Sequence, residues 1–194
     1  MRFGKRCADL KSHIKKSLLF RERDCRKRQA FLDEIKNIPL NELVYIDESG
    51  LDENLHRRFG WSIRGDKIIG EVSGKARKRL SIIAALNGKE IKAPLYFEGY
   101  TDTHVFNGWI ETCLVQELKA GQTVILDNAS FHKSPKTKTL IEKAGCSLKY
   151  LPTYSPDLNP IEPRWAIMKA RVRKHRGHDE TIEKTINTVF EMYY

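Results

Sequence analysis

Three acidic residues stand at places where a charged side chain needs a reason. Asp47 and Asp127 each directly follow a four-residue apolar run, and Glu162 opens a strongly basic segment after a proline-rich stretch. Carboxylates brought side by side raise one another's pKa unless a cation lies between them. A hard cation such as Mg²⁺ is held by a few carboxylates together with waters and phosphate oxygens. The spacing therefore raises the hypothesis of a three-carboxylate metal site.

A metal site of this kind suits phosphoryl transfer. Two ions roughly 4 Å apart can hold the attacking and the leaving oxygen of an in-line displacement. We expect Mg²⁺ at this site, with Mn²⁺ as a substitute, and two ions once a phosphate-bearing substrate is bound.

Each acid also has an ordinary structural explanation. Asp47 and Asp127 could belong to polar turns that follow strands. Asn159, Pro160 and Glu162 are spaced like an N-cap, a first-turn proline and the acid of a capping box. These explanations hold for each acid singly, but the coincidence of all three favours a shared site.

The elements that must position these acids follow from hydrophobic periodicity and turn signals. Asn87-Gly88 predicts a hairpin, and Pro94 within the returning strand predicts an edge position. The expected class is α/β: a mixed sheet of three to four antiparallel strands, then parallel additions, flanked by helices. We expect strands at 43–46, 59–63, 80–86, 91–97, 123–126 and 147–151, and helices at 26–37, 102–118, 135–144, 160–176 and 180–193.

This order of elements predicts where the acids lie. If strands 43–46 and 123–126 are parallel neighbours, Asp47 and Asp127 lie together beyond the carboxyl ends of the strands, where open α/β sheets bind ligands. In helix 160–176 an apolar stripe should face the core, and Glu162 lies about 100° from it, at the rim of the buried face. The stripe consists of Ile161, Trp165, Met168 and Val172.

Composition limits the partners. The 194 residues are 40% hydrophobic and 31% charged, which is ordinary for a globular domain, but the formal net charge of +10 favours a polyanion. No apolar run approaches the length of a membrane span, so we expect no membrane partner. The four cysteines are widely spaced, which favours free thiols over disulfides or a zinc site. Candidate phosphate contacts along the basic helix, if it is not simply a solvated face, are Arg164, Lys169, Arg173 and Lys174.

Several other residues have two interpretations. Asn128 and His132 could support the site by orienting a water or touching a phosphate, or could satisfy local backbone. Strand alternation points Glu48 away from Asp47, which argues against a ligand role. Asp157 fits turn chemistry, and Trp61 either stacks on a base or, more commonly for such a residue, packs on a strand.

Three motifs together resemble the catalytic domain of the mariner superfamily of transposases, especially its bacterial insertion-sequence members. They are Asp47-Glu-Ser-Gly50, Ile125-Leu-Asp-Asn-Ala-Ser-Phe-His132 and Leu151-Pro-Thr-Tyr-Ser-Pro-Asp-Leu-Asn-Pro-Ile-Glu162. The resemblance covers roughly residues 15–190. Mariner elements proper carry Asp as the third acid, so Glu162 is similar to other branches of the superfamily.

The resemblance implies a ribonuclease-H-like fold of the retroviral-integrase superfamily and a Mg²⁺-dependent site with Asp47, Asp127 and Glu162 as ligands. It implies hydrolysis at transposon ends, followed by attack of the freed 3′-hydroxyl on target DNA. The partners would be double-stranded DNA and a second copy of the chain in the active complex. The chain would act at the nucleoid in a bacterium or in the nucleus of a eukaryote.

Full-length members of that superfamily begin with helix-turn-helix domains. We therefore expect residues 1–40 to be a basic arm or linker from an N-terminal DNA-binding region that this sequence lacks, and residues 41–194 to be the catalytic domain. Two other functions stay open: a ribonuclease-H-like nuclease or resolvase, and a catalytically silent DNA-binding remnant.

Overall fold

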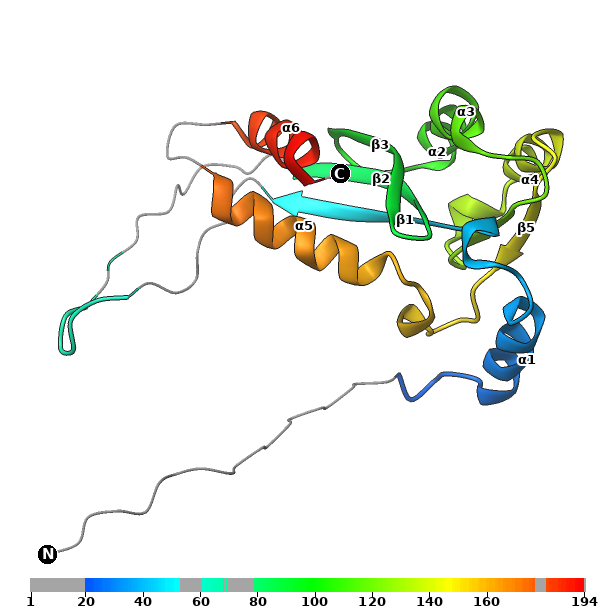
Figure 1. Ribbon diagram of the computed structural model, residues 1–194, viewed down its shortest axis with the longest axis horizontal. Coiled ribbons are helices and arrows are strands. Elements are labelled where there is room, and N and C mark those ends of the chain that lie inside the picture. Colours follow the sequence, from blue (N-terminus) through cyan, green and yellow to red (C-terminus); the bar gives the residue numbers. More distant parts are fainter. Residues whose placement is uncertain (1–19, 53–60, 68, 70–78, 177–180, 194) are drawn as a thin grey trace, which may run out of the picture.

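A five-stranded mixed sheet organises the protein, whose computed structural model describes residues 20–52, 61–67, 69, 79–176 and 181–193 (Figure 1). The strand order is β3-β2-β1-β4-β5. β1 to β3 are antiparallel, and β4 and β5 add in parallel on the other side of β1. The predicted α/β class is thus confirmed, with three antiparallel strands in the described ranges. The strands are β1 Leu43–Asp52, β2 Arg79–Asn87, β3 Glu90–Glu98, β4 Thr123–Leu126 and β5 Ser147–Tyr150.

Helices cover both faces of this sheet. α5 and α6 pack on one face of the sheet, in a shared hydrophobic cluster, and α2, α3 and α4 pack on the other face. A π-helical stretch, Ile110–Leu114, joins α2 to α3, so the predicted helix 102–118 is nearly continuous. The α-helices are α1 Cys25–Ile35, α2 Thr103–Trp109, α3 Val115–Glu117, α4 Pro135–Lys143, α5 Glu162–His175 and α6 Ile182–Tyr193.

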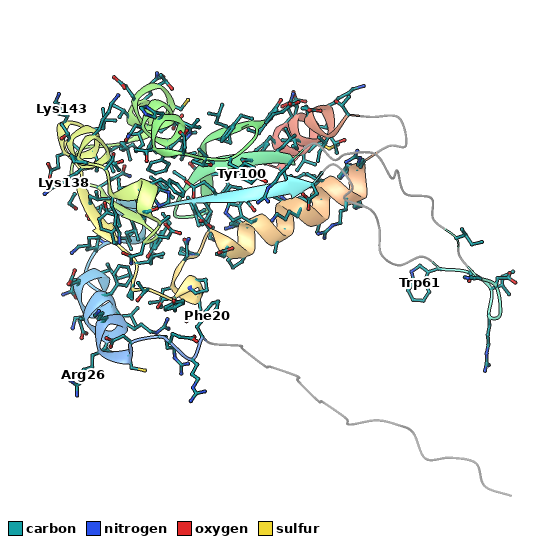
Figure 2. The ribbon with its side chains drawn as sticks, turned by 180° about the vertical axis from the view of Figure 1, so that it is seen from behind. Phe20, Arg26, Trp61, Tyr100, Lys138 and Lys143 are labelled. Atoms are coloured by element: carbon teal, nitrogen blue, oxygen red, sulfur yellow. The ribbon has the colours of Figure 1, made fainter. Side chains whose placement is uncertain are left out.

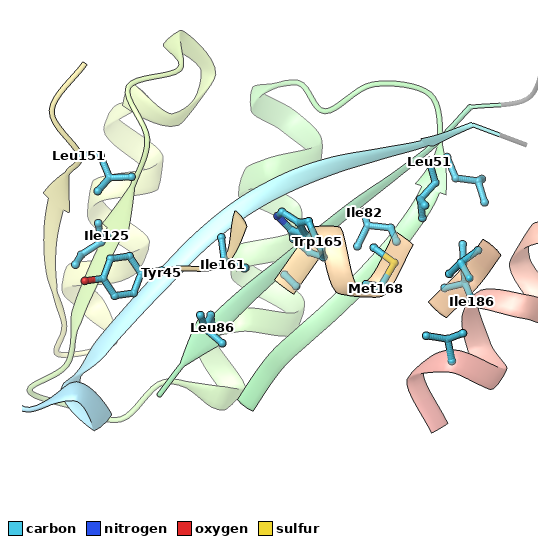
Figure 3. Packing of buried hydrophobic residues seen from close by; sticks show 14 of the residues in the cluster. Tyr45, Leu51, Ile82, Leu86, Ile125, Leu151, Ile161, Trp165, Met168 and Ile186 are labelled. Atoms are coloured by element: carbon cyan, nitrogen blue, oxygen red, sulfur yellow. The ribbon is translucent and has the colours of Figure 1, made fainter. Parts of the chain in front are cut away.

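The apolar stripe of α5 packs on the sheet as predicted. Ile161, Trp165, Met168 and Val172 are all buried, in one cluster with Tyr45 of β1 (Figure 3). Burial of each such large side chain contributes roughly 1.5–3 kcal/mol. Because strand residues alternate between faces, the face of β1 that carries Tyr45 also carries Asp47. The packing of α5 therefore fixes which helix stands over the first acid.

The β2–β3 hairpin confirms the turn predicted at Asn87-Gly88 and the edge position predicted from Pro94. Its loop is Gly88-Lys89, and Gly88 has φ 58°, a left-handed conformation that glycine adopts without penalty. β3 is an edge strand, and Pro94 follows a residue of positive φ, Ala93, next to a register shift against β2. A proline at such an irregular edge position removes no essential ladder hydrogen bond.

The predicted strand at residues 59–63 is wrong for the part that can be described. Residues 61–63 are not extended in any sheet, and Trp61 is completely exposed, projecting away from the body of the molecule (Figure 2). The packing interpretation of Trp61 is therefore wrong. Residues 59 and 60, and the basic turn before Arg79, lie outside the described residues.

α1 packs against the rest of the fold. Phe31 is buried in the same cluster as the α5 stripe, and Arg28 donates two hydrogen bonds to Asp157, at 2.9 and 2.6 Å. Lys149 of β5 pairs with Glu34 of α1. Residues 1–19 lie outside the described ranges, so the origin of residues 1–40 as an arm stays a prediction.

Two compositional points can be placed on the structure. Cys25, Cys113 and Cys146 are free thiols. In the part of the chain that can be described, no helix combines the length and apolarity needed to cross a bilayer.

Candidate active site

The three predicted acids line one pocket. Asp47, Asp127 and Glu162 border a cavity of about 400 Å³, together with the loop at residues 151–156 and Asn159. The pocket lies where β1 and β4 run side by side and where α5 begins. Residues separated by up to 115 positions in the chain are thus brought to one place by the predicted sheet.

Parallel pairing of β1 with β4 puts the two aspartates at equivalent positions. The register pairs Tyr45 with Ile125, and each aspartate stands two residues further along its strand direction. The predicted neighbourhood is confirmed. The prediction that Asp47 ends its strand is wrong, because β1 continues to Asp52 through antiparallel pairing with β2. Asp47 is therefore held inside a strand, not in a turn.

Asp47 is buried among groups that disfavour its charge. Its side chain is 8% exposed, and the indole Nε1 of Trp165 donates a hydrogen bond to its Oδ2 at 3.1 Å. Burial raises the pKa of Asp47 to about 7, and the negative charges of Glu162 and Glu48 add to the effect. The bond from Trp165 opposes this shift without cancelling it.

Both hydrogen bonds that described residues make to the carboxylate of Asp127 are made to the same oxygen, Oδ1. Its Oδ1 accepts hydrogen bonds from the backbone N–H of Ala129 at 2.8 Å and from Nδ1 of His132 at 2.6 Å. Burial would raise the pKa of Asp127, but these bonds outweigh it and hold that pKa below its usual value. Among the described residues no hydrogen bond reaches Oδ2, so this second oxygen is available to a ligand.

Glu162 stands on the first turn of α5, and its side chain is exposed. The capping-box alternative is wrong: no side chain caps this helix, and Ile161 occupies the N-cap position. The expected cap, Asn159, is 4% exposed, and its Oδ1 has no hydrogen-bond partner in the described structure. Glu162 therefore has no role in a capping box, the structural explanation that competed with a ligand role.

These groups fit a hard divalent cation. Asp127 retains an oxygen without a described hydrogen bond, and Asp47 and the exposed Glu162 border the same pocket. Within the described ranges no three His, Cys, Asp or Glu side chains already converge as a preformed cation site.

Of the two predicted supporting residues, Asn128 satisfies a backbone group, one of its two predicted roles, whereas His132 makes contacts that neither prediction included. The side-chain amide of Asn128 donates to the carbonyl of Leu151, which ties the loop after β4 to the end of β5. His132 is completely buried, so it cannot touch a phosphate, and its ring nitrogens contact Asp127 and Glu48. Asp157 is used by Arg28, as described above.

The predicted DNA-contacting residues lie on α5. Arg164 and Lys169 are half-buried, whereas Arg173 and Lys174 are exposed. Burial lowers the pKa of Lys169, and the nearby carboxylate of Glu162 opposes that shift. A basic helix that begins at the pocket could lead a phosphate backbone towards it.

Sequence reasoning missed the contacts of Trp165 and Glu48 and the buried position of Asn159. Trp165 was assigned to packing alone, although its indole N–H also serves Asp47. Glu48 was correctly placed on the opposite face, but its contact with His132 was not foreseen. Asn159 was interpreted as a cap. A buried indole N–H needs an acceptor, and this requirement was the one available signal for Trp165.

A mixed sheet of antiparallel strands extended by parallel ones and covered by helices, with one acid on β1 and a second directly after β4, has the architecture of a ribonuclease-H-like fold. Residues 42–183 match the family described as "DDE superfamily endonuclease". The chain belongs to this family.

Solved structures share the fold at low sequence identity. The "Mos1 transposase paired-end complex with left transposon end" has a TM-score of 0.67 and 15% identity, covering 92% of this chain and 57% of that one. The "catalytic domain of Mos1 mariner transposase" has a TM-score of 0.58 and 14% identity, over 87% of this chain and 78% of that one. This chain therefore spans less than two thirds of the length of the chains in the Mos1 complexes. Among curated proteins no sequence matches significantly.

Proposed function

We propose that this chain is the catalytic domain of a DNA transposase, which cleaves transposon ends and joins the freed 3′-hydroxyl to target DNA. The observation that carries the proposal is the meeting of Asp47, Asp127 and Glu162 in one pocket of a chain from the DDE endonuclease family. The likeness to the Mos1 structures supports the fold on which that proposal rests.

Each residue has a defined part in the proposed site. Mg²⁺ or Mn²⁺, when bound by the three acids, supplies a Lewis acid for the phosphoryl oxygens and lowers the pKa of an attacking water or hydroxyl. Trp165 orients Asp47 through its indole bond, and the amide of Ala129 fixes one oxygen of Asp127. Glu162 contributes from the first turn of α5, where it is exposed and borders the pocket.

The proposed partner is double-stranded DNA. The formal charge of +10 and the basic residues of α5 favour a polyanion next to the pocket. Solved structures of similar fold include Mos1 with a transposon end and a Mos1 strand transfer complex. We propose that two copies of the chain act together on DNA, at the nucleoid of a bacterium or in a nucleus.

A nicking assay tests the role of the acids. Asp47→Asn, Asp127→Asn and Glu162→Gln each keep the size of the side chain but remove the charge that a cation needs. We expect each to reduce Mg²⁺- or Mn²⁺-dependent nicking of duplex DNA by at least about 100-fold, while the fold persists by circular dichroism. Glu111→Gln, which removes a carboxylate from an exposed pair with Lys136, is the matched control and should cut like the parent. Equal cutting by the three site variants and the parent would refute the site.

A nuclease of the same fold is the second candidate, since the family description names endonuclease activity. Both candidates require the three acids. Only a transposase also joins a 3′-hydroxyl end to a second duplex, so the joining reaction separates the two.

A further inference from the structure

Two more ionisable side chains, His132 and Glu48, are linked to Asp127 by hydrogen bonds. Nδ1 of His132 is 2.6 Å from Oδ1 of Asp127, and Nε2 of His132 is 2.8 Å from Oε1 of Glu48. These three side chains thus connect β1, through the 3-10 helix Ser130–Lys133, to the pocket. It lies on the face of the sheet opposite Trp165, because Glu48 and Asp47 alternate along β1.

His132 is held rigidly. It is 0% exposed, and the rings of Phe106 and Phe131 each lie 4.3 Å from its ring, centroid to centroid. Its carbonyl accepts a hydrogen bond from the hydroxyl of Tyr150 at 3.2 Å. A ring packed in this way cannot turn to contact solvent or DNA, so it can act on the pocket only through its two carboxylate partners.

The hydrogen bonds select one oxygen of Asp127. Oδ1 accepts from His132 and from the amide of Ala129, whereas Oδ2 receives no hydrogen bond from the described residues. A carboxylate anchored through one oxygen presents the other in a fixed direction. Glu48, 16% exposed, fixes the far side of the imidazole and so its orientation.

We propose that Glu48 and His132 are positioning residues which hold Asp127 so that its Oδ2 points at the divalent cation. The inference rests on the proposed function, because it assumes that Asp127 is a metal ligand. Outer groups that orient a metal ligand typically change metal affinity or activity by 10–100-fold when removed. Neither residue touches the substrate, so neither is a catalytic residue.

The rival explanation is that the Glu48–His132–Asp127 chain only ties β1 to the loop after β4. It predicts lower stability in the variants and an unchanged metal affinity in the folded protein. Metal binding to the folded chain therefore separates the two explanations, whereas activity alone does not.

The experiment titrates the full chain with Mn²⁺ alone and follows free Mn²⁺ by electron paramagnetic resonance, without DNA. Glu48→Ala removes the last carboxylate, Glu48→Gln keeps an acceptor for Nε2, and Glu111→Ala is the control that removes an exposed, distant carboxylate. We expect Glu48→Ala to weaken Mn²⁺ binding by about 10–100-fold, Glu48→Gln to recover most of it, and Glu111→Ala to match the parent. Substitution at His132 is avoided as the main test, since loss of a ring packed between Phe106 and Phe131 threatens folding.

Nicking of duplex DNA at saturating Mn²⁺ is the second measurement. Glu48→Ala keeps the carboxylate of Asp127 but no longer holds it in place, so this variant should recover much of its nicking activity when Mn²⁺ is in excess. Asp127→Asn lacks the carboxylate and should not recover. Glu48→Ala that binds Mn²⁺ as tightly as the parent, while folded by circular dichroism, would overturn the inference. A parent that binds Mn²⁺ with the expected variant order but cuts no DNA would instead contradict the proposed function alone.

Discussion

At the scale of single residues, the most unusual group is the buried carboxyl of Asp47. Burial and neighbouring negative charge raise its pKa to about 7, from an ordinary value near 3.8. The folded chain therefore binds this proton more tightly than the unfolded chain does. Its contribution to the free energy of unfolding is fully present below about pH 4 and is lost as the pH rises through 7.

Asp47→Asn should therefore stabilise the metal-free protein at high pH. The variant lacks the ionisable group, so its advantage over the parent should grow from pH 5 to pH 8, reaching on the order of 2–4 kcal/mol. Thermal melts in EDTA at both pH values measure this difference. An advantage of the same size at pH 5 and pH 8 would show that the carboxyl of Asp47 does not titrate in this range.

The proton on the carboxyl of Asp47 also competes with a metal ion for binding to that carboxyl. A ligand carboxyl must lose its proton before it binds a cation, so Mn²⁺ should raise the melting temperature of the parent more at pH 8 than at pH 6. In Asp47→Asn the rise should be small at both pH values. A metal-induced shift that grows towards acid pH would contradict the assignment of Asp47 as a ligand.

At the scale of elements, β1 and α5 form the site together. β1 carries Asp47 inside a strand that β2 pairs on one side, and α5 places Trp165 over it. The indole therefore has two functions, packing in the core and holding a site carboxylate. Such a dual role explains why the apolar stripe was recognisable in the sequence while the bond to Asp47 was not.

Trp165→Phe isolates the second of these functions. It keeps an aromatic ring but removes the Nε1 donor, and should cost about 1–3 kcal/mol of stability. It should also slow metal-dependent nicking, because Asp47 loses the bond that orients it. Trp109→Phe is the matched control: Nε1 of Trp109 donates to the carbonyl of Ala93, and neither residue lines the pocket. If both variants nick DNA equally well, the bond to Asp47 has no role in the reaction.

The basic face of α5 makes a prediction about DNA binding. Lys169→Ala and Arg173→Ala should weaken duplex binding at all sequences alike, and each should reduce the slope of log affinity against log salt by about 1. Lys138→Ala on α4, whose lysine pairs with Glu142, is the control and should leave the slope unchanged. Fluorescence anisotropy over a salt series gives both quantities. An unchanged slope in the α5 variants would mean that this face is only solvated.

At the scale of the whole molecule, much of the fold could be predicted because its signals are local. β4 is a short buried run, the Asn87-Gly88 pair is a strong hairpin signal because glycine adopts a positive φ, and the apolar stripe of α5 has a clear helical period. The end of β1 could not be predicted, because Glu48-Ser-Gly50 resembles a turn until β2 is known to pair with it. The contact between Glu48 and His132 spans 84 positions and depends on the parallel register of β1 and β4, which no local pattern carries.

At this scale the proposed function requires one protein to perform both cutting and joining, and this requirement is the central claim. The most direct measurement incubates the protein with Mg²⁺, a plasmid and a labelled duplex whose transposon-like end carries a 3′-hydroxyl, beside the same duplex ending in a 3′-deoxy sugar. The predicted result is label joined covalently to the plasmid only from the 3′-hydroxyl duplex, and none with Asp127→Asn. Nicked plasmid without joined label from the parent, under conditions that support cutting, would contradict the claim and identify a nuclease instead.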